Sequence, residues 1–160
     1  MGESTLRRLT SDDWTVLSDV RLRALADSPD AFGSTLEREQ TFGEKEWRRR
    51  LVRPVWIVEA DGRGVAMAGA FSNEGVLQVW GMWTDPAHRG RGHARALLDA
   101  LVGEAVREGR VVGLHVNLAN PGARAFYESY GFVGTGELEP LRPGSDQRIE
   151  LMLINPKPVG

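Results

Sequence analysis

The most informative stretch of the sequence is Asp85–Arg95, which reads Asp-Pro-Ala-His-Arg-Gly-Arg-Gly-His-Ala-Arg. It lies between a strand-like run, Val76–Thr84, and the most regular apolar stripe of the chain. Gly90 and Gly92 allow the backbone to turn tightly and to approach a ligand closely. The amides that follow open a helix, where free N–H groups and the helix dipole favour an anion. The stretch therefore predicts a phosphate or pyrophosphate site, to which three arginines add charge: Arg89, Arg91 and Arg95.

The segments before this loop show strand and helix patterns in turn. Thr5–Leu9 predicts a short first strand. Hydroxyls and acids at Thr10–Asp13 predict a helix start, and Pro29 predicts where that helix stops. A capping box at Thr41–Glu44 predicts a second helix. Three antiparallel strands joined by glycine-containing turns are then expected: Val55–Ala60, Val65–Phe71 and Val76–Thr84.

The segments after the loop predict a crossover between parallel strands. Apolar residues from Ala94 to Ala105 recur at helical spacing, and Gly109 closes this helix. Val111–Val116 is almost continuously apolar, as in strands buried on both faces. Three elements complete the chain: a helix over Pro121–Tyr130, a strand from Phe132 and a strand over Arg148–Ile154. The order predicts a mixed α/β fold in one domain, residues 1–160.

Composition narrows the classes of function. The chain of 160 residues contains no cysteine, which excludes a thiolate nucleophile, a cysteine zinc site and a disulfide framework. Its 20 Lys and Arg residues nearly balance 22 Asp and Glu residues, so we expect neither nucleic acid nor a membrane as partner. No run of apolar residues could span a membrane, and the first residues do not resemble a signal peptide. A cytoplasmic protein is therefore expected.

Two other phosphate-binding classes fit the loop less well. A Walker loop is excluded because no Gly-Lys-Ser/Thr follows the glycines. A dinucleotide-binding oxidoreductase is a closer alternative, since Gly90-x-Gly92 opens a helix. However, the third position of that fingerprint is not glycine, and the next strand ends in Asn117 rather than an acid. His88 and His93 have no further ligand at metal-binding spacing, so no metal is expected.

Two motifs resemble the GNAT (Gcn5-related) N-acetyltransferases. The family's acyl-CoA signature is Arg/Gln-x-x-Gly-x-Gly/Ala, and this sequence has Arg-Gly-Arg-Gly-His-Ala over residues 89–94. The second match lies downstream: Leu114-His115-Val116, Asn120, Ala123, Phe126-Tyr127-Glu128 and Gly131-Phe132. Together the two motifs cover about residues 77–133.

The resemblance implies a fold, a co-substrate and the residues that bind it. The expected sheet is mostly antiparallel, with a splayed parallel pair whose second strand begins near Val111, and helices on its flanks. The expected co-substrate is acetyl-CoA. Its binding residues would be Met82, Trp83, Thr84, Arg89, Gly90, Arg91, Gly92, His93, Ala94, Arg95, Asn120, Ala123 and Tyr127.

The resemblance also suggests catalytic residues. Tyr127 matches the tyrosine that protonates the departing thiolate, a role that suits a phenol with a pKa near ~10. Many members place a glutamate base on the strand before the loop, but Gln78 stands there and cannot act as a base. His115 is the preferred base, because imidazole accepts protons near neutral pH. Glu74, Glu59 and water remain alternatives.

The expected function is direct transfer of acetyl from acetyl-CoA to a primary amine on a small molecule or a protein N-terminus. A non-catalytic acyl-CoA-binding module is the alternative, and the oxidoreductase is a weaker one. We expect Asp30–Gln40 and Pro140–Gln147 to select the acceptor. Acids in and near these segments would attract a cationic amine: Asp30, Glu37, Glu39, Glu137, Glu139 and Asp146. The sequence leaves open whether the protein forms a homodimer.

Overall fold

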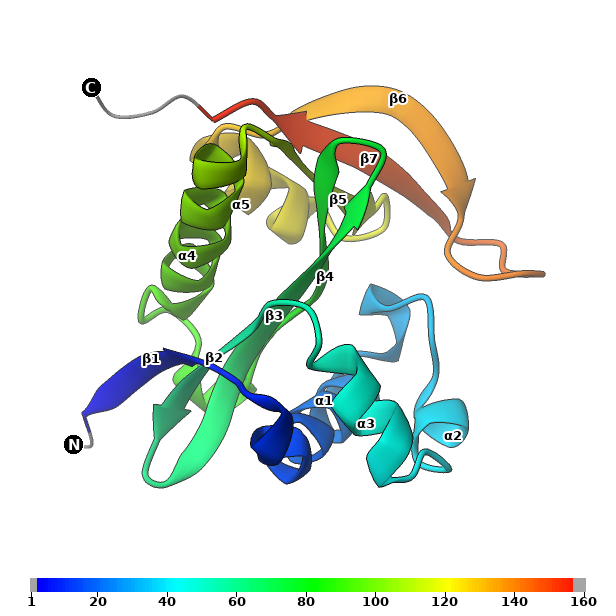
Figure 1. Ribbon diagram of the computed structural model, residues 1–160. Coiled ribbons are helices and arrows are strands. Elements are labelled where there is room, and N and C mark those ends of the chain that lie inside the picture. Colours follow the sequence, from blue (N-terminus) through cyan, green and yellow to red (C-terminus); the bar gives the residue numbers. More distant parts are fainter. Residues whose placement is uncertain (1–2, 157–160) are drawn as a thin grey trace.

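A single seven-stranded sheet organises the protein (Figure 1). The computed structural model describes residues 3–156, so residues 1–2 and 157–160 of the expected domain lie outside the described residues. The strand order is β1-β2-β3-β4-β5-β7-β6. Every neighbouring pair is antiparallel except β4 and β5. This arrangement confirms the expected mixed α/β class with one parallel pair.

The strands are β1 (Ser4–Arg8), β2 (Val55–Ala60), β3 (Arg63–Asn73), β4 (Val76–Thr84), β5 (Val111–Asn117), β6 (Val133–Pro140) and β7 (Arg148–Ile154). The α-helices are α1 (Trp14–Asp27), α2 (Leu36–Glu39), α3 (Glu44–Arg50), α4 (His93–Glu108) and α5 (Pro121–Tyr130). Three single 3-10 turns are η1 (Ser11–Asp13), η2 (Pro29–Ala31) and η3 (Pro86–His88). Within these described residues, no helix has both the length and the apolar character needed to cross a membrane.

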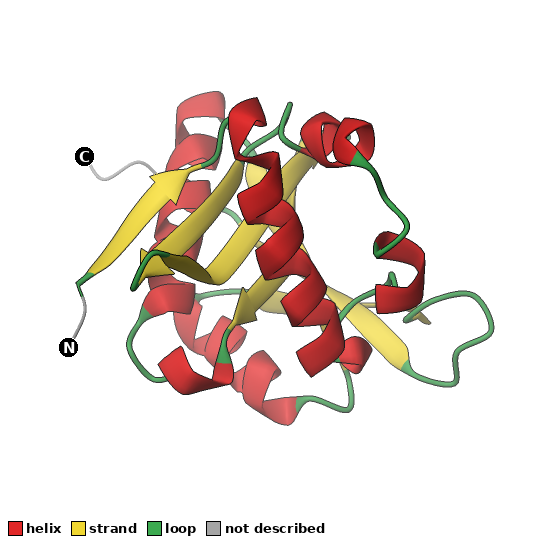
Figure 2. Cartoon of the chain, turned by 90° about the horizontal axis from the view of Figure 1, so that it is seen from below, coloured by secondary structure: helices red, strands yellow, loops and turns green. Residues whose placement is uncertain are grey.

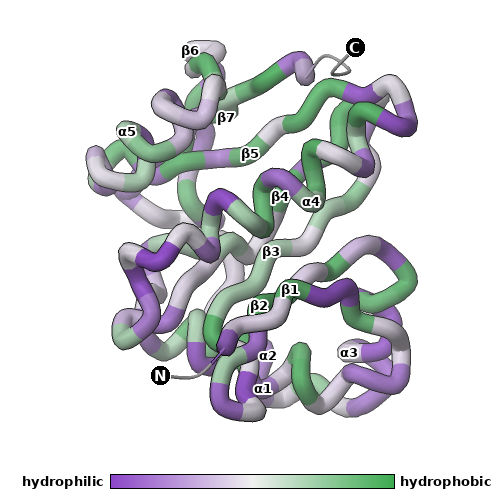
Figure 3. Tube along the Cα trace, turned by 90° about the vertical axis from the view of Figure 1, so that its left-hand side faces the viewer, coloured by the Kyte–Doolittle hydropathy of each residue, from purple (hydrophilic) through white to green (hydrophobic). Residues whose placement is uncertain are grey.

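Helices cover both faces of the sheet (Figure 2) and enclose two apolar cores. One core joins α4 and α5 to one face through Leu97, Leu101 and Phe132. The other joins α1 and α3 to the opposite face through Leu17 and Trp47. Hydrophobic colour accordingly follows the middle strands, whereas α3 is largely hydrophilic on its outer side (Figure 3).

Local sequence explains most element ends, with one correction. α4 is preceded by Gly92 and followed by Gly109, whose φ angles of 81° and 67° lie in the left-handed region. The capping box expected at Thr41–Glu44 is displaced. α3 begins at Glu44, and the Gly43 N–H donates to the Glu46 carboxylate at 3.1 Å. The short helix α2 and the η2 turn had no clear signal in the sequence.

The parallel pair β4 and β5 separates after three residues. Pairing runs only from Val76 to Gln78 on β4 and from Val111 to Gly113 on β5. Beyond these pairs the strands part, and β5 pairs with β7 on its other side. The inner edge of β4 from residue 79 onward therefore has no strand partner. The expected splayed pair is confirmed, and it opens the sheet at its centre.

A bulge in β4 sets the orientation of two tryptophans. Strict alternation predicts that Trp80 and Trp83 face opposite sides of the sheet. The β3–β4 register instead shifts between the pairs Gly69–Trp80 and Met67–Trp83, which leaves one extra residue on β4. Gly81, with φ of 69°, lies at this point. Both indole rings consequently pack on the α1 side of the sheet.

Candidate active site

Two adjoining cavities occupy the opening between β4 and β5. The first, here called the sheet cavity, has a volume of about 350 Å³ and lies between Val79–Met82 of β4 and Leu114–Asn117 of β5. The second, the loop cavity, has a volume of about 410 Å³ and reaches from the end of β4 to the start of α4. Five residues line both cavities: Ala31, Met82, Asn120, Ala123 and Tyr127. The two spaces are thus continuous around the shared residues.

The loop cavity gathers almost all residues that the sequence assigned to the co-substrate. Its lining includes Met82, Trp83, Thr84, Arg89, Gly90, Gly92, His93, Ala94, Arg95, Asn120, Ala123 and Tyr127. Arg91 is the exception, because its side chain is exposed and does not line the cavity. The shared location is a geometric finding, and the binding roles of these residues stay predictions.

The loop presents backbone donors to this cavity. The N–H groups of residues 89–95 donate to no protein acceptor within the described range. Gly90 and Gly92 have φ angles of 78° and 81°, and a Cβ on either would meet nothing within 4 Å. Unpaired amides beside the positive end of α4 can donate hydrogen bonds to an anion. The free space around both glycines shows that a left-handed backbone, rather than close packing, requires them.

Arg89 has a different contact from the one expected. Its guanidinium donates to the Thr84 carbonyl at 3.0 Å and to the Asp27 carboxylate at 2.9 Å. The Trp83 indole N–H donates to the same carboxylate at 3.0 Å. Hydrogen bonds from Trp83 and Ser28, together with the charge of Arg89, lower the pKa of Asp27 despite a small opposing effect of burial. Arg89 therefore ties the loop to α1 and β4, while Arg95 is a freer cation of this cavity.

Two histidines add polar groups at the loop. Burial, followed by the charges of His88 and Arg91, lowers the pKa of His93, so its imidazole is neutral near pH 7. His88 has a buried Nδ1 with no hydrogen-bond partner, and its ring lines the loop cavity. The neutral ring of His93 can donate one hydrogen bond and accept another.

Tyr127 lies where the two cavities meet. Its side chain is 9% exposed, and burial raises its pKa to about 12. The phenol is consequently protonated throughout the neutral range. Tyr127 lies on α5, and Asn120 caps the N-terminus of this helix. The Asn120 side-chain oxygen accepts from the Ala123 N–H at 3.0 Å. That bond leaves the Asn120 amide NH₂ free to donate toward the cavities.

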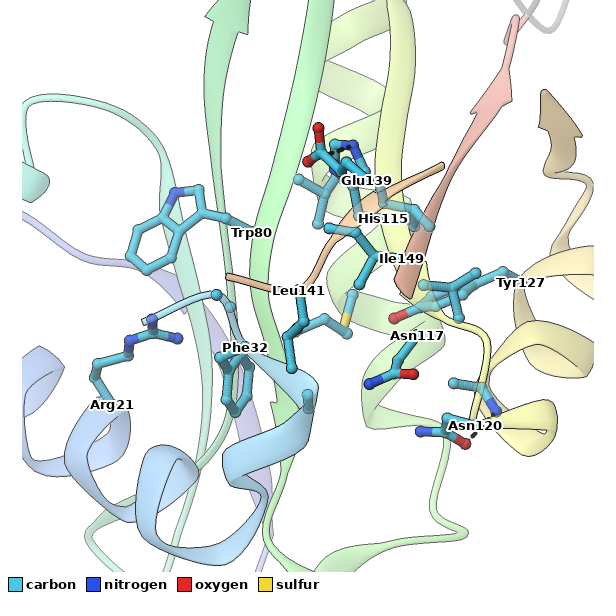
Figure 4. Close-up of a pocket in the computed structure, with 18 residues that line it drawn as sticks. Arg21, Phe32, Trp80, His115, Asn117, Asn120, Tyr127, Glu139, Leu141 and Ile149 are labelled. Carbon is cyan, nitrogen blue, oxygen red and sulfur yellow. Dashed lines mark hydrogen bonds and ion pairs between the residues drawn. The ribbon is translucent and has the colours of Figure 1, made fainter. Parts of the chain in front are cut away.

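His115 lies on β5 with two polar neighbours. Its Nδ1 is 3.1 Å from Nε2 of Gln78, the last β4 residue that pairs with β5, where its partner is Gly113. Its Nε2 is 3.6 Å from the Glu139 carboxylate, which forms an ion pair when His115 is protonated. His115 and Glu139 both line the sheet cavity, where Figure 4 shows them close together. Gln78, which is itself unable to act as a base, therefore contacts the base candidate directly.

The other base candidates lie elsewhere. Glu59 accepts hydrogen bonds from Arg7 at the β1–β2 edge of the sheet. Glu74 occupies the β3–β4 turn with φ of 48°. Neither residue lines the sheet cavity or the loop cavity. Among the side chains considered from the sequence, only His115 is brought to the site.

A buried charged cluster borders the sheet cavity on the α1 side. Arg21, only 5% exposed, donates from Nε and Nη2 to the two oxygens of Glu39, both at 3.0 Å. Arg50 donates to the same carboxylate at 2.7 Å. Burial alone would raise the pKa of Glu39, but the hydrogen bonds from Arg21 and Arg50 outweigh it and lower the pKa to about 2. Arg21 itself lines the sheet cavity.

The two segments expected to select the acceptor meet over the sheet cavity. The Asn117 amide donates to the Asp30 carbonyl at 2.8 Å and to the Gln147 side chain at 2.6 Å. Arg142 donates to the Pro29 carbonyl at 2.9 Å. Residues 31–33, Glu139 and Leu141 contribute to the cavity wall. The hydrogen bonds thus fasten both segments to the end of β5.

The acidic character expected for these segments is largely absent from the cavity. Of the six acids, only Glu139 lines the sheet cavity. Glu39 is fully buried and neutralised by two arginines. Sequence reasoning grouped these acids by position in the chain, whereas the fold turns Glu39 inward. Arg21 was not predicted from the sequence, because an arginine within an amphipathic helix gives no sign that it lines a cavity.

The fold and the site together define a mixed α/β protein whose two cavities occupy the split in its own sheet. A mostly antiparallel sheet of this kind differs from the doubly wound parallel sheet of dinucleotide-binding oxidoreductases. Residues 17–132 match the acetyltransferase (GNAT) family. The chain belongs to this family.

Known proteins similar to the chain agree with this assignment. Mycothiol acetyltransferase of Beutenbergia cavernae is 31% identical over 115 residues, 69% of this chain and 38% of the relative. That of Clavibacter michiganensis is 35% identical over 100 residues, 62% of this chain and 32% of the relative. The chain therefore matches less than two fifths of the length of either relative.

Solved structures show the same fold. YncA from Salmonella typhimurium, solved with acetyl-CoA, superposes with a TM-score of 0.75 at 21% identity, covering 96% of this chain and 94% of YncA. A GNAT acetyltransferase from Streptococcus pneumoniae gives 0.80 at 15% identity, with coverage of 95% and 98%. The ribosomal-protein-S18-alanine N-acetyltransferase of Escherichia coli gives 0.72 at 20% identity, with coverage of 99% and 97%.

Proposed function

We propose that the protein binds acetyl-CoA in the loop cavity and transfers its acetyl group directly to a primary amine in the sheet cavity. The observation that carries this proposal is the junction of the two cavities at Met82, Asn120 and Tyr127. A thioester entering from the loop and an amine entering from the opposite side would meet at this junction. Juxtaposition of two reactants supplies a large part of the catalysis of a bimolecular reaction.

The residues around the loop cavity suit acetyl-CoA. The unpaired amides of residues 89–95 would hold the pyrophosphate, and Arg95 would add positive charge. The open inner edge of β4 over Met82–Thr84 would bond the amide groups of the pantetheine arm, because unpaired strand backbone seeks partners. When bound, acetyl-CoA supplies the acetyl group and a thiolate leaving group.

Tyr127 would act as the general acid. Its phenol, with a pKa of about 12, retains its proton at neutral pH and can donate it to the sulfur as the carbon–sulfur bond breaks. Its hydroxyl oxygen points into the drawn pocket in Figure 4. The tyrosinate would regain its proton from solvent after the products leave.

His115 would act as the general base. The amine must lose a proton as its nitrogen bonds to the acetyl carbon, and a neutral imidazole can accept that proton directly or through a water. The Gln78 amide nitrogen lies 3.1 Å from Nδ1 and donates to it in this orientation, which places the imidazole proton on Nε2. For Nε2 to accept the proton of the amine, the Gln78 amide would turn by 180° so that its oxygen accepts from Nδ1–H. The Glu139 carboxylate, 3.6 Å away, would stabilise the resulting imidazolium.

The composition of the chain supports direct transfer. No cysteine is present to carry an acetyl group as a thioester intermediate. Attack by the amine on the bound thioester then needs both substrates on the protein at once. The expected cytoplasmic location and the homodimer left open from the sequence stay predictions.

Two measurements test this function and separate it from the alternatives. Calorimetric titration should show binding of acetyl-CoA and none of NAD or NADP, whereas binding of NAD or NADP would favour the oxidoreductase. Release of free CoA should then depend on the amine in a panel screened with mass detection. Binding of acetyl-CoA without amine-dependent release would identify a non-catalytic acyl-CoA module.

A further inference from the structure

Arg21 leaves one nitrogen without a partner at the wall of the sheet cavity. Nη1 is buried and has no hydrogen-bond partner among the described residues, although Nε and Nη2 are fully engaged by Glu39. Two aromatic rings also pack against the guanidinium. The Phe32 ring centroid lies 4.8 Å from Cζ of Arg21, and that of Trp80 lies 5.4 Å away. The in-plane N–H groups of Nη1 are the donors that remain.

The free nitrogen lies beside the bulge of β4. A Cβ added to Gly81 would be 3.5 Å from Nη1, and Gly81 itself lines the sheet cavity. Figure 4 shows Arg21 beside Phe32 and Trp80, on the other side of the pocket from Tyr127. A buried donor without a partner costs stability unless a ligand or water satisfies it.

The charge of this cluster favours an anion. Arg21 and Arg50 share the single carboxylate of Glu39, which leaves one net positive charge that is mostly shielded from solvent. The only other charged or titratable side chains on the cavity wall besides Arg21 and Tyr127 are His115 and Glu139. One side of the cavity is therefore cationic through Arg21, and another side carries His115 and the Glu139 carboxylate.

We infer that the amine acceptor carries a carboxylate, which accepts hydrogen bonds from Nη1 of Arg21 while its amino group faces His115 and Glu139. The acceptor would be a small amino carboxylate such as an amino acid. The cavity volume of about 350 Å³ lies near the lower end of the range for small-molecule sites, ~300–1,000 Å³. The hydrogen bonds of Asn117 and Arg142 hold two segments over this space, which favours a small molecule over a protein N-terminus.

This inference rests on the proposed function, because it takes the reaction to be acetyl transfer to an amine. A matched set of amines tests the preference for a carboxylate. Leucine, leucinamide and isopentylamine share a side chain and differ in the carboxylate; methionine and phenylalanine provide equivalent sets. A charge-assisted hydrogen bond at a desolvated site predicts that kcat/KM for the acid exceeds that for the simple amine by about 10- to 100-fold. Equal values for the acid and the simple amine would overturn the inference. Equal values for the acid and the amide would show that a carbonyl suffices, as in a peptide N-terminus, and would also overturn it.

Two variants test whether Arg21 causes the preference for the acid. Arg21→Met should remove the preference for the acid while leaving acetyl-CoA affinity nearly unchanged, which also reports that the protein is folded. Arg50→Met removes the net positive charge of the cluster but keeps Nη1, because Arg50 contacts the Glu39 carboxylate without lining the cavity, and it should reduce the preference for the acid less than Arg21→Met does. A preference that survives Arg21→Met would contradict the assignment of Nη1.

Direct binding separates failure of this inference from failure of the proposed function. Calorimetry of the CoA-loaded protein with the same three amines needs no turnover. Tighter binding of the acid without any acetylation would support the anion site and refute the transferase. Absence of discrimination in both binding and turnover would refute the anion site, whatever the outcome for catalysis.

Discussion

At the scale of single residues, Tyr127 is the side chain on which the proposed chemistry depends most. It is one of only two tyrosines in the chain, and both lie on α5. The hydroxyl of Tyr130 donates to Asp99 at 2.6 Å, and its ring lines neither cavity. The two phenols therefore form a natural pair of test and control.

Replacing Tyr127 with Phe should lower kcat by about 10²- to 10⁴-fold, because the departing thiolate would lose its proton donor. The affinity for acetyl-CoA should change little, since the ring and its packing are retained. Steady-state kinetics and calorimetry measure the two quantities. Tyr130→Phe should keep kcat, and an unchanged kcat in Tyr127→Phe would remove Tyr127 from the mechanism.

Replacing His115 with Ala should flatten the acidic limb of the profile of kcat/KM against pH. That limb arises when the base becomes protonated at low pH and can no longer accept a proton from the amine. Glu74→Gln serves as the control, because the β3–β4 turn lies outside both cavities, and it should retain the limb. Persistence of the limb in His115→Ala would exclude His115 as the base.

Glu39 contributes to the stability of the whole protein through its lowered pKa. Its pKa in the folded protein, about 2, lies below its ordinary value of 4.5. Ionised Glu39 therefore stabilises the fold above about pH 4.5, and this contribution is lost as the pH falls toward 2. Its size at neutral pH is about 3 kcal/mol.

Urea unfolding at pH 7 and near pH 2 checks this prediction. Glu39→Gln should reduce the free energy of unfolding at pH 7 by about 3 kcal/mol and have a much smaller effect at the acidic pH. Glu37→Gln, an exposed neighbour in α2, should have no effect at either pH. An equal loss at both pH values in Glu39→Gln would refute the ionic origin of the stabilisation.

The sequence indicated the residues of the loop better than those of the acceptor side. Gly90, Gly92 and Tyr127 belong to motifs with fixed spacing, so their positions followed from the chain itself. The contacts of Arg21 and Gln78 depend instead on partners 18 and 37 residues away. Pairings across such distances arise from the tertiary fold, which local patterns do not encode.

At the scale of elements, the start of α4 and the bulge in β4 shape the two cavities. The start of α4 requires a left-handed backbone at Gly92, with φ of 81°, and no neighbouring atom restricts a Cβ there. Any effect of a substitution at this position is therefore an effect on the backbone. This makes Gly92 a clean probe of the loop conformation.

Gly92→Ala should destabilise the protein by about 1–2 kcal/mol, the cost of a left-handed alanine. It should also weaken acetyl-CoA binding by about tenfold, because the following amides would lose their alignment. Gly103→Ala within α4 is the control, and it should stabilise by up to ~1 kcal/mol because alanine favours helix. Thermal unfolding and calorimetry measure both effects. Retained acetyl-CoA affinity in Gly92→Ala would contradict the proposed role of the loop.

Element boundaries were predictable where residues with restricted geometry mark them. α5 runs from Pro121 to Tyr130 as predicted, with Gly131 after its end. The bulge at Gly81 was not predictable, since an isolated glycine in a strand fits several conformations. This one residue reverses the expected orientation of Trp83 relative to Trp80.

At the scale of the whole molecule, the split between β4 and β5 holds the two adjoining cavities in which we propose that the two substrates bind. The β4–α4–β5 crossover and its parallel pairing followed from the order of the predicted elements. The insertion of β7 between β5 and β6 did not, because neighbours along the chain usually pair with each other. That insertion brings the segment between β6 and β7 to the end of β5, where Asn117 binds it.

The central claim is that acetyl passes directly from acetyl-CoA to an amine within this split. The most direct test incubates the protein with isotope-labelled acetyl-CoA, with and without leucine, and follows the label by mass spectrometry of the amine and of the intact protein. Direct transfer should give label on the amino group of leucine, free CoA in equal amount, and no labelled protein when the amine is omitted. Label held covalently on the protein, or no labelled product from any amine in the panel although acetyl-CoA binds, would contradict it.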